Sequence, residues 1–446
     1  MAREVIKIDV SSPASVANMG AGYDSLALAV SLRNRFTMYV EMRPLETGES
    51  EFRFEIGGDY AGIDPRIRLA NGNLFAEAFV RTRQELCEAQ RLRIDKFPIT
   101  VCQSVDIPPI RGLGSSSSAA VAGVAAAVEF LRCHYRDREF PGYRKDEDRE
   151  LCASLAMAVD SCPDNVCAAM SGGLTYSFVP DKEPSDRRTY RALHYFHEDI
   201  DHPDLRIVAL VPALQITTKE ARKVLGNKQY SIKDVQFNIP RAVCIPAILR
   251  SRRYRLLRHA LQDKIHQLPR AEEYFTLDKK YLDLEDVFRE VVDAGAYGAC
   301  VSGSGSTLVA FCATSDAIMV SESFVRAFEK RAANFIKLDR VYTLKVDGDG
   351  VAIERDSNNR GNAFQELTFY ECTTEIAAWK AKASARNNTD QTESRIRSMP
   401  PAPSVPEPAP TPIELGPQRT EKQPAPPKKP WRIRMRWEFP RKDGKK

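Results

Sequence analysis

The sequence predicts an α+β fold in two domains, followed by a polar tail. Strand-like and helix-like segments mingle over most of the chain, without the regular strand–helix alternation of a doubly wound sheet. At 446 residues the chain is long enough for two compact domains, because a domain usually has about 100–200 residues. After residue 353 the composition becomes polar and then Pro-rich. We therefore expect domains at 1–185 and 186–353, and a largely disordered tail at 354–446.

The first domain is predicted to begin with strands and to continue with helices. Alternating apolar residues predict a strand from residue 3 that breaks at Ser11-Ser12-Pro13. An apolar turn and a second strand are expected within 25–44, and a helix of small residues after the serines at 115–118. The other elements expected here are a helix at 73–92, a strand at 97–109, a helix at 149–160 and a strand at 172–180.

The second domain is predicted to begin with a buried strand at 205–214. A long helical segment at 233–261 should be interrupted at Pro240 and Pro246, since proline lacks the N–H group that a helix needs. Residues 299–312 predict a strand and a tight turn, followed by a strand or a helix. The remaining expected elements are a helix at 217–226, a helix at 284–295 closed by Gly295, a last convincing strand at 340–350 and one helix in the tail at 366–385.

The stretch PPIRGLGSSSS, residues 108–118, places two glycines and four serines directly before the Ala-rich helix. Glycine permits backbone shapes that a Cβ would forbid, and serines at a helix start accept bonds from its free N–H groups. Free N–H groups and the helix dipole together favour a bound anion. A flexible loop is the alternative, but the stretch runs without a break into the helix. We favour a phosphate site, which is not a Walker A loop because no Gly-Lys-Ser/Thr follows.

Charge and cysteine usage exclude several classes of protein. The net charge is +5, and residues 417–446 hold eleven Lys/Arg against three Asp/Glu. The folded part is therefore near neutral, and its charge does not indicate binding to nucleic acid. The ten cysteines form no C-x-x-C pair, and we expect them to be reduced and mostly buried. The start has no apolar signal region, and no apolar run approaches the roughly 20 residues of a membrane span. These features predict a cytoplasmic protein.

Three separated stretches are similar to the three motifs of the GHMP small-molecule kinases. They are SSPASVANMGAGYDSLALAV at 11–30, PPIRGLGSSSSAAVAG at 108–123 and ACVSGSGSTLVAF at 299–311. The first stretch resembles the homoserine kinase branch most closely. Further stretches that resemble this branch are CPDNVCAAMSGGL at 162–174, TKEARKVLG at 218–226 and KIHQLPR at 264–270. The resemblance covers about residues 3–350.

The resemblance implies a fold and an activity. The fold would be a ribosomal-protein-S5-like N-terminal domain joined to a ferredoxin-like C-terminal domain. The activity would be the ATP- and Mg²⁺-dependent phosphorylation of the side-chain hydroxyl of L-homoserine to O-phosphohomoserine, as in threonine biosynthesis, by a homodimer. Two alternatives stay open: a kinase for another small hydroxy amino acid, and a GHMP-fold binding protein with little or no activity and an interaction tail.

The resemblance also assigns residues to ATP and Mg²⁺. Gly303 and Gly305 resemble a tight turn beside the phosphate loop, and Asn73 resembles the position near the nucleotide base. The branch has a Glu upstream of Asp-Asn that helps to hold Mg²⁺; here DSCPDN at 160–165 offers Asp160, with the hydroxyl of Ser116 as second ligand. The implied ATP-binding residues are Asn73, Pro109, Arg111, Gly112, Leu113, Gly114, Ser115, Ser116, Ser117, Gly303 and Gly305.

The acceptor amino acid would be bound by polar groups from several stretches of the sequence. Asn18 and Asp24 suit a hydroxyl or an ammonium group, and Arg222 and Arg270 resemble the branch's two carboxylate-holding arginines. Asn165 stands where some GHMP kinases have an aspartate base, so we expect no strong general base. Asp24 would orient the acceptor hydroxyl and receive its proton late in the phosphoryl transfer. Asp24 and Asn165 are therefore the two implied catalytic residues.

The tail lies outside the resemblance. Residues 399–430 are Pro-rich and predict disorder or extended polyproline II structure. In WRIRMRW, residues 431–437, apolar residues alternate with arginines, so a strand would be cationic on one face. Such a segment suits an acidic partner, nucleic acid or an anionic membrane surface; a solubilising basic end without a partner is the alternative.

Overall fold

The computed structural model describes most of the chain up to residue 393. The described residues are 4–393 except 63–67, 70, 94, 137, 142–145, 182–189, 201, 227, 278–279, 333–335 and 355–364. The Pro-rich segment 399–430 and the segment 431–437 lie outside the described residues.

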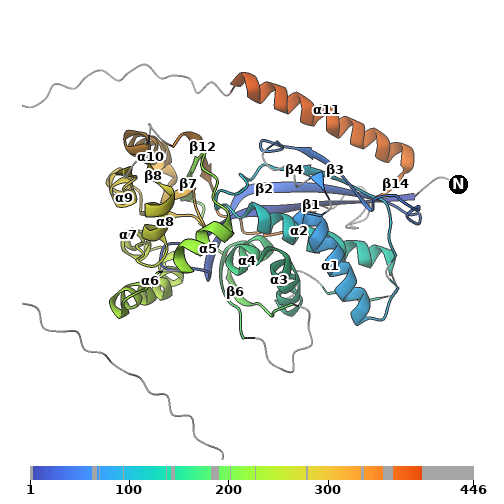
Figure 1. Ribbon diagram of the computed structural model, residues 1–446, viewed down its shortest axis with the longest axis horizontal. Coiled ribbons are helices and arrows are strands. Elements are labelled where there is room, and N and C mark those ends of the chain that lie inside the picture. Colours follow the sequence, from blue (N-terminus) through green and yellow to red (C-terminus); the bar gives the residue numbers. More distant parts are fainter. Residues whose placement is uncertain are drawn as a thin grey trace, which may run out of the picture. The chain divides into compact units, whose positions relative to one another are not determined.

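Eight strands form the first sheet, in the order β13-β1-β2-β4-β3, with β14 beside β1, β5 beside β2 and β6 beside β5. All neighbours are antiparallel except β3 and β4. The long strands β1 and β2 form its centre (Figure 1). The strands of this sheet are β1 (Glu4–Ala17), β2 (Leu26–Glu41), β3 (Phe52–Gly57), β4 (Ile99–Ser104), β5 (Leu174–Phe178), β6 (His194–Glu198), β13 (Ala352–Glu354) and β14 (Gln365–Thr368).

The expected break of the first strand at Ser11-Ser12-Pro13 is wrong. β1 continues to Ala17, and its register against β2 shifts between Pro13 and Ala14. Proline cannot donate to a strand ladder, so the ladder slips at Pro13 and the strand continues. The shift carries the chain directly to Asn18, at the beginning of the loop that later contributes to the site.

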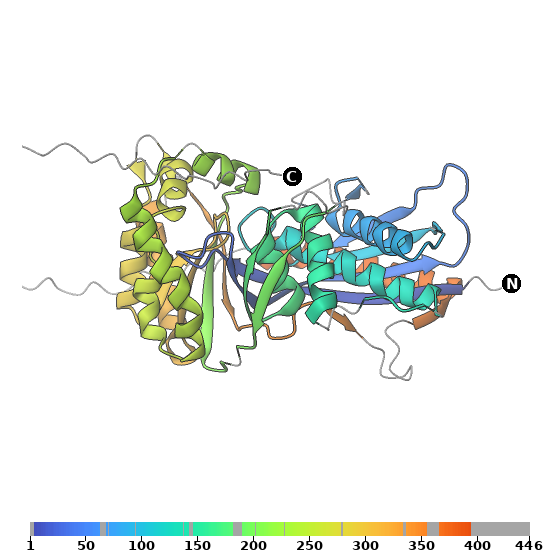
Figure 2. The same ribbon diagram turned by 90° about the horizontal axis from the view of Figure 1, so that it is seen from below.

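Four helices cover one face of this sheet (Figures 1 and 2). They are α1 (Leu74–Ala89), α2 (Ser115–His134), α3 (Asp146–Asp160) and α4 (Pro163–Ser171). α2 is long and apolar enough to cross a membrane, but 89% of its apolar stretch is buried inside the fold, so we interpret it as a core helix. Its small residues allow close packing: a Cβ on Gly123 would lie 2.2 Å from the carbonyl oxygen of Phe75 in α1.

The second sheet has four antiparallel strands in the order β10-β11-β7-β12. The central strand β7 is buried on both faces: Val208 and Leu210 contact α9 and α10, whereas Ile207 and Ala209 join a core that includes Val16 of the first sheet. The elements of this half are β7 (Leu205–Pro212), α5 (Thr218–Gly226), α6 (Ile232–Arg250), α7 (Leu257–Ala260), α8 (Gln267–Tyr274), β8 (Thr276–Leu277), β9 (Lys280–Tyr281), α9 (Leu284–Asp293), β10 (Gly298–Val301), β11 (Leu308–Ala313), α10 (Ala317–Ala332) and β12 (Leu338–Leu344), with short 3₁₀ turns at Tyr254–Leu256 and Thr314–Asp316.

The helix α6 is not interrupted at its prolines, contrary to the sequence expectation. Ser231 and Asp234 form a capping box at its start, and the helix runs through Pro240 and Pro246 to Arg250. Pro240 and the residue four positions earlier, Gln236, are both exposed, so the carbonyl that proline leaves without an N–H partner faces solvent.

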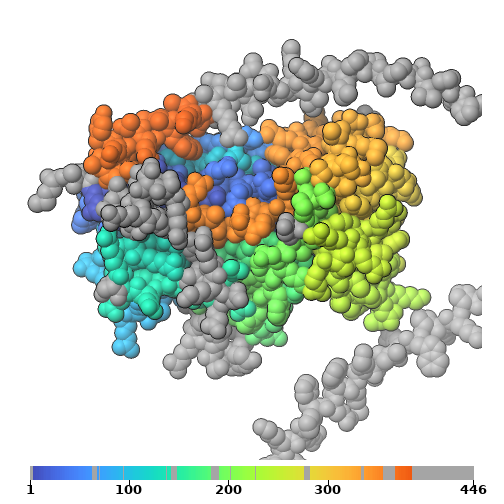
Figure 3. All heavy atoms as spheres, turned by 180° about the vertical axis from the view of Figure 1, so that it is seen from behind, coloured from blue at the N-terminus to red at the C-terminus, as the bar shows by residue number. Residues whose placement is uncertain are grey.

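The structure also differs from the expected domain limits of 185 and 353. β6, which follows the first limit, pairs with β5 in the first sheet. After the second limit, β13 and β14 pair with β1, and α11 (Phe369–Glu393) follows. α11 lies on the sheet face opposite α1–α4 (Figures 1 and 3). The strand at 338–344 is therefore not the last one, and the ordered chain extends well into the expected tail.

Apolar and charged contacts hold α11 against the sheet. Cys372 is buried with Tyr39, and Ile376 and Trp379 pack against the same cluster. Glu375 accepts a hydrogen bond from the Tyr39 hydroxyl at 2.9 Å and pairs with Lys7 at 2.8 Å. Leu367 of β14 belongs to the same cluster, so β14 and α11 together cover this part of the sheet.

We predict that two C-terminal deletions have opposite effects. Deleting 399–446 should leave the melting temperature and ATP binding unchanged, because a Pro-rich polar chain buries too little apolar surface to offset its ordering entropy. Deleting 365–446 removes β14 and α11 and uncovers Tyr39 and Cys102, so it should lower the melting temperature by several degrees. Calorimetry of the two variants checks this; equal melting temperatures would show that α11 contributes nothing to stability.

Candidate active site

Segments from both halves of the fold surround one cavity of about 570 Å³. The first half contributes the loop after β1, the loop 108–114 with the start of α2, and the segment between α3 and α4. The second half contributes the start of α5, one residue of α8 and the turn between β10 and β11. The predicted residues that line it are Asn18, Asp24, Gly112, Leu113, Gly114, Ser115, Ser116, Asp160, Asn165, Arg222, Arg270 and Gly303.

The phosphate loop ends in a left-handed residue that begins α2. Gly114 has φ 68° and is the N-cap, and the N–H of Ser118 makes the first helical bond to its carbonyl at 2.9 Å. The N–H groups of residues 115–117 precede that bond and lie at the positive end of the helix dipole. A Cβ on Gly114 would lie 2.3 Å from the hydroxyl oxygen of Ser15, so glycine permits the close packing of the loop against β1. This geometry suits phosphate oxygens.

The turn between β10 and β11 lies directly against the phosphate loop. The hydroxyl of Ser302 donates to the carbonyl of Gly112 at 2.6 Å, and the N–H of Thr307 donates to the carbonyl of Arg111 at 3.1 Å. A Cβ on Gly112 would lie 2.2 Å from the carbonyl oxygen of Ser302. Glycine at 112 therefore permits the close approach of two segments far apart in the sequence.

Two serines and a carboxylate meet beside the phosphate loop. The hydroxyls of Ser117 and Ser116 donate to the carboxylate of Asp160, and the thiol of Cys162 does so as well. Burial raises the pKa of Asp160, and these hydrogen bonds oppose the rise. A bound cation would compensate for this burial, and hydroxyl and carboxylate oxygens are ligands that Mg²⁺ accepts. The donor set thus fits Mg²⁺ held jointly with phosphates.

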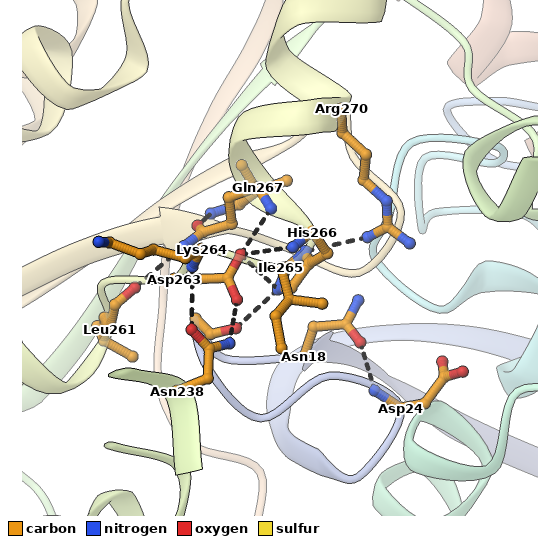
Figure 4. Close-up of polar contacts among 12 residues, drawn as sticks. Asn18, Asp24, Asn238, Leu261, Asp263, Lys264, Ile265, His266, Gln267 and Arg270 are labelled. Atoms are coloured by element: carbon orange, nitrogen blue, oxygen red, sulfur yellow. Dashed lines mark hydrogen bonds and ion pairs between the residues drawn. The ribbon is translucent and has the colours of Figure 1, made fainter. Parts of the chain in front are cut away.

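The loop after β1 presents Asp24 to the cavity. Asn18 has φ 65°, a conformation that asparagine tolerates better than most residues. Its side-chain oxygen accepts from the N–H of Asp24 at 2.8 Å (Figure 4). Its amide donates to the carbonyl of Gly303 at 2.7 Å. Asn18 thus shapes the loop with its side chain, and the half-exposed carboxylate of Asp24 faces the cavity.

Two arginines reach the same end of the cavity. Arg222 donates to the carbonyl of Ser161 at 2.8 Å and lies 3.9 Å from Asp24. Arg270 is 4% exposed, donates to the carbonyl of Gly303 at 2.9 Å and lies over the ring of Tyr23. A carboxylate beside two guanidinium groups is a complementary environment for the ammonium and carboxylate of an amino acid.

Asp164 is a cavity residue that the sequence analysis did not single out. It is 2% exposed, and the N–H groups of Asn165, at 2.8 Å, and of Asn18 donate to its carboxylate. Burial and then the neighbouring Asp24 carboxylate raise the pKa of Asp164 to about 7. The sequence signal for Asp164 is the PDN triplet at 163–165, in which it directly precedes Asn165.

The raised pKa of Asp164 predicts a pH-dependent stability. In the folded state the Asp164 carboxyl stays protonated at pH values where it would ionise in the unfolded chain. The stability that this proton contributes is therefore fully present below about pH 4 and is lost as the pH rises through about 7. Because one pKa unit is about 1.4 kcal/mol, the free energy of unfolding of the wild type relative to Asp164→Asn should fall by about 2–3 kcal/mol between pH 5 and pH 8. Urea unfolding of both proteins measures it; a constant difference would refute the assignment.

Several residues predicted for ATP lie outside the cavity. Asn73 is buried and caps α1: its oxygen accepts from the N–H of Phe75 at 3.0 Å, and its amide donates to Gln103 at 3.1 Å. Arg111 points away and pairs with Asp339 at 2.6 Å. The side chains of both are therefore used within the fold. The other predicted residues that do not line the cavity are Pro109, Ser117 and Gly305.

Further residues line the cavity without having been predicted. Lys219, at the start of α5, is exposed and adds a cation to the cavity lining. The sequence signal for Lys219 is the stretch TKEARKVLG at 218–226, which also contains Arg222. The other unpredicted lining residues are Pro108, Ile110, Ser161, Cys162, Ile216, Thr217, Thr218 and Ser304.

Comparison with protein families gives two matches. The model of the GHMP kinases N terminal domain matches residues 73–173, and the model of the GHMP kinases C terminal domain matches residues 244–330. The first match includes the phosphate loop, and the second includes Arg270 and the turn at 302–307. Each match therefore contains part of the cavity.

Two proteins with similar sequences are both described as homoserine kinases. The chain is 31% identical to the homoserine kinase of Aliarcobacter butzleri over 345 residues, which are 77% of this chain and 99% of that protein. It is 30% identical to the homoserine kinase of Wolinella succinogenes over 343 residues, 77% of this chain and 98% of that protein. Both matches cover nearly the whole relative.

Solved structures agree in fold. The homoserine kinase from Cytophaga hutchinsonii has a TM-score of 0.59 at 22% identity and covers 78% of this chain and 97% of its own. The L. major mevalonate kinase in complex with R-mevalonate has a TM-score of 0.51 at 14% identity, covering 77% of this chain and 96% of its own. The expected two-domain α+β fold is therefore confirmed.

Proposed function

The chain belongs to the GHMP kinases, in the homoserine kinase branch, and on that premise we propose that it transfers the terminal phosphoryl group of ATP to the side-chain hydroxyl of L-homoserine. It is a small-molecule kinase, and GHMP kinases use ATP as phosphate donor. The observation that carries the proposal is that one cavity joins an open helix N-terminus to a carboxylate beside two arginines. The first feature suits phosphates, and the second suits an amino acid.

ATP would be held by backbone groups more than by side chains. The N–H groups at the start of α2 would meet the phosphates, and Lys219 and the hydroxyl of Ser115 would add further donors. Mg²⁺, held by Ser116 and Asp160 together with phosphate oxygens, would neutralise charge on the transferred group. Asn73 stays a proposed neighbour of the nucleotide base only through its place at the start of α1, because its side chain is occupied there.

The acceptor would be oriented by charge at both of its ends. Arg270 and Arg222 would hold the carboxylate, Asp24 would attract the ammonium, and Asp24 and Asp164 would orient the hydroxyl. The hydroxyl oxygen attacks the γ-phosphorus as the bond to the ADP oxygen breaks, and its proton passes to the Asp24 carboxylate. Asn165 is hydrogen-bonded to Ser15 at 2.8 Å and cannot take a proton. Positioning and charge neutralisation thus supply the catalysis.

The test is turnover with a panel of alcohols. Purified protein is incubated with ATP, Mg²⁺ and L-homoserine, D-homoserine, L-serine or L-threonine, and ADP release is followed. We expect kcat/KM to be highest for L-homoserine. ADP release with another alcohol but none above background with L-homoserine would assign a different acceptor. No ADP release with any of them would favour the binding protein without catalysis.

The remaining expectations are untested by the structure. Homodimer formation, a cytoplasmic location and a role in threonine biosynthesis stay predictions, as does a partner for the basic segment 431–437 of the tail. A pull-down with the isolated 431–446 peptide, at low and at physiological salt, tests the last of these. Recovery of nothing at either salt would leave the solubilising end as the interpretation.

A further inference from the structure

Among the described residues, the Arg270 guanidinium makes its hydrogen bonds to the protein through one terminal nitrogen. Its Nη1 donates to the carbonyl of Gly303 at 2.9 Å and to Nδ1 of His266 at 3.2 Å. Its Nε is buried and has no hydrogen-bond partner among the described residues. A buried, unpartnered donor on a cavity-lining arginine indicates a contact that the protein itself does not supply. Gly303 and His266 hold Nη1, and they thereby set the direction in which the Nε–H of Arg270 points.

The partners of His266 leave one arrangement of its ring protons. Nε2 lies 2.7 Å from the carbonyl oxygen of Gly20, which can only accept, so Nε2 carries the hydrogen. Nδ1 faces Arg270, whose guanidinium can only donate, so Nδ1 is the acceptor. A ring with hydrogens on both nitrogens could not accept from Arg270. Burial lowers the pKa of His266; the Asp263 carboxylate opposes the shift and the charge of Arg270 adds to it, so the neutral form is favoured.

A buried carboxylate fixes the backbone that carries both residues. Asp263 accepts from the N–H groups of His266 and Gln267, each at 2.7 Å, and the amide of Asn238 donates to its other oxygen (Figure 4). Asp263 lies 3.9 Å from Nε2 of His266, too far for a hydrogen bond, so it does not compete with Gly20 for that hydrogen. His266 and Arg270 are four residues apart and lie on one side of α8.

His266 therefore connects three segments of the cavity wall. Through Gly20 it contacts the loop that presents Asp24, and through Arg270 it contacts the carbonyl of Gly303. Asn18 donates to the same carbonyl of Gly303. The ring of Tyr23 lies 5.4 Å from that of His266 and covers it on one side.

We propose that His266, in its neutral form with the hydrogen on Nε2, is a positioning residue that fixes the Arg270 guanidinium for the carboxylate of the acceptor. The proposal rests on the proposed function, because it assumes an acceptor with a carboxylate. A purely structural role is the alternative: His266 would then matter only for joining the Gly20 loop to α8. The two roles use different nitrogens of the same ring, so they can be separated.

Two substitutions each remove one of the two hydrogen bonds. His266→Asn places an amide oxygen near the position of Nδ1 and keeps an acceptor for Arg270, but loses the contact with Gly20. His266→Gln places an amide nitrogen near the position of Nε2 and keeps the donor to Gly20, but loses the acceptor for Arg270. We expect His266→Gln to raise the acceptor KM about tenfold and His266→Asn to raise it about threefold. The ATP KM should change less than twofold in both variants.

The control is His259→Gln, because His259 is exposed and does not line the active-site cavity. It should leave both KM values unchanged, and thermal unfolding shows whether each variant is folded. Equal KM increases in both His266 variants, or a larger increase in His266→Asn, would overturn the proposal in favour of the structural role.

The test of the role of His266 can be separated from the test of the proposed homoserine kinase activity. If the wild type uses another carboxylate-bearing alcohol, the same comparison is made with that acceptor. If no alcohol reacts, ¹⁵N NMR of the six histidines, with His266 assigned by its loss in the variants, determines the ring form directly. A hydrogen on Nδ1, or a charged ring at neutral pH, would overturn the proposal whatever the acceptor.

Discussion

Gly114→Val is expected to reduce ATP affinity by at least roughly 100-fold, which corresponds to about 2.7 kcal/mol. Gly114 has φ 68°, a conformation that costs a residue with a Cβ about 1–2 kcal/mol. A Cβ there would lie 2.3 Å from the hydroxyl oxygen of Ser15 and 2.9 Å from the amide oxygen of Asn165. The loop would have to move, and the N–H groups at the start of α2 would lose their alignment. Calorimetric titration with ATP measures the loss.

Gly48→Val is the matched control for backbone strain. Gly48 has φ 84° and nothing within 4 Å of the position of a Cβ, so its substitution brings the same kind of strain without a collision. It should lower stability slightly and leave ATP affinity unchanged. If Gly114→Val is folded by circular dichroism and binds ATP as tightly as the wild type, the phosphate loop has been assigned wrongly.

Arg270→Ala is expected to lower kcat/KM for the acceptor by about 10- to 150-fold, because a hydrogen bond to a charged group is worth about 1.5–3 kcal/mol. The buried guanidinium has one unpartnered donor, and truncation would leave the acceptor carboxylate without its main partner. The carbonyl of Gly303 would keep its bond from Asn18, so the turn should stay in place. Steady-state kinetics with either substrate varied should show a higher acceptor KM and an unchanged ATP KM.

Arg241→Ala is the control for removal of an arginine. Arg241 stacks on the ring of Phe237 at 3.4 Å from its centroid and does not line the cavity. Its loss should leave both KM values unchanged. If Arg270→Ala raises the acceptor KM and the ATP KM by the same factor, Arg270 acts on the fold of the site and not on the acceptor.

The backbone of the site could be predicted from the sequence more fully than its side chains. Gly112 and Gly114 stand out because few residues tolerate their conformation, and the serines that follow mark the start of α2. Arg111 and Asn73 could not be placed in the same way. Arg111 lies within the motif and Asn73 is assigned through the resemblance, yet the structure directs their side chains to Asp339 and to the first turn of α1. Sequence proximity does not determine the direction of a side chain.

Long-range contacts account for the other differences. Asp164 has an unusual pKa because it is buried beside Asp24, a residue far from it in sequence. The strand β1 continues past Pro13 because β2 offers a shifted register, which no pattern within β1 contains. The role of His266 depends on Gly20, which is 246 positions away. Each of these features requires the fold before it can be recognised.

The most direct test of the central claim is identification of the product. The full-length protein is incubated with ATP, Mg²⁺ and L-homoserine, and the mixture is analysed by ³¹P NMR and mass spectrometry. We predict one phosphate ester on the side-chain oxygen of homoserine for each ADP formed, and ester formation that is about 10- to 150-fold slower in the Arg270→Ala variant at the same limiting acceptor concentration. Formation of ADP with inorganic phosphate alone, or no consumption of ATP, would contradict the assignment as a homoserine kinase.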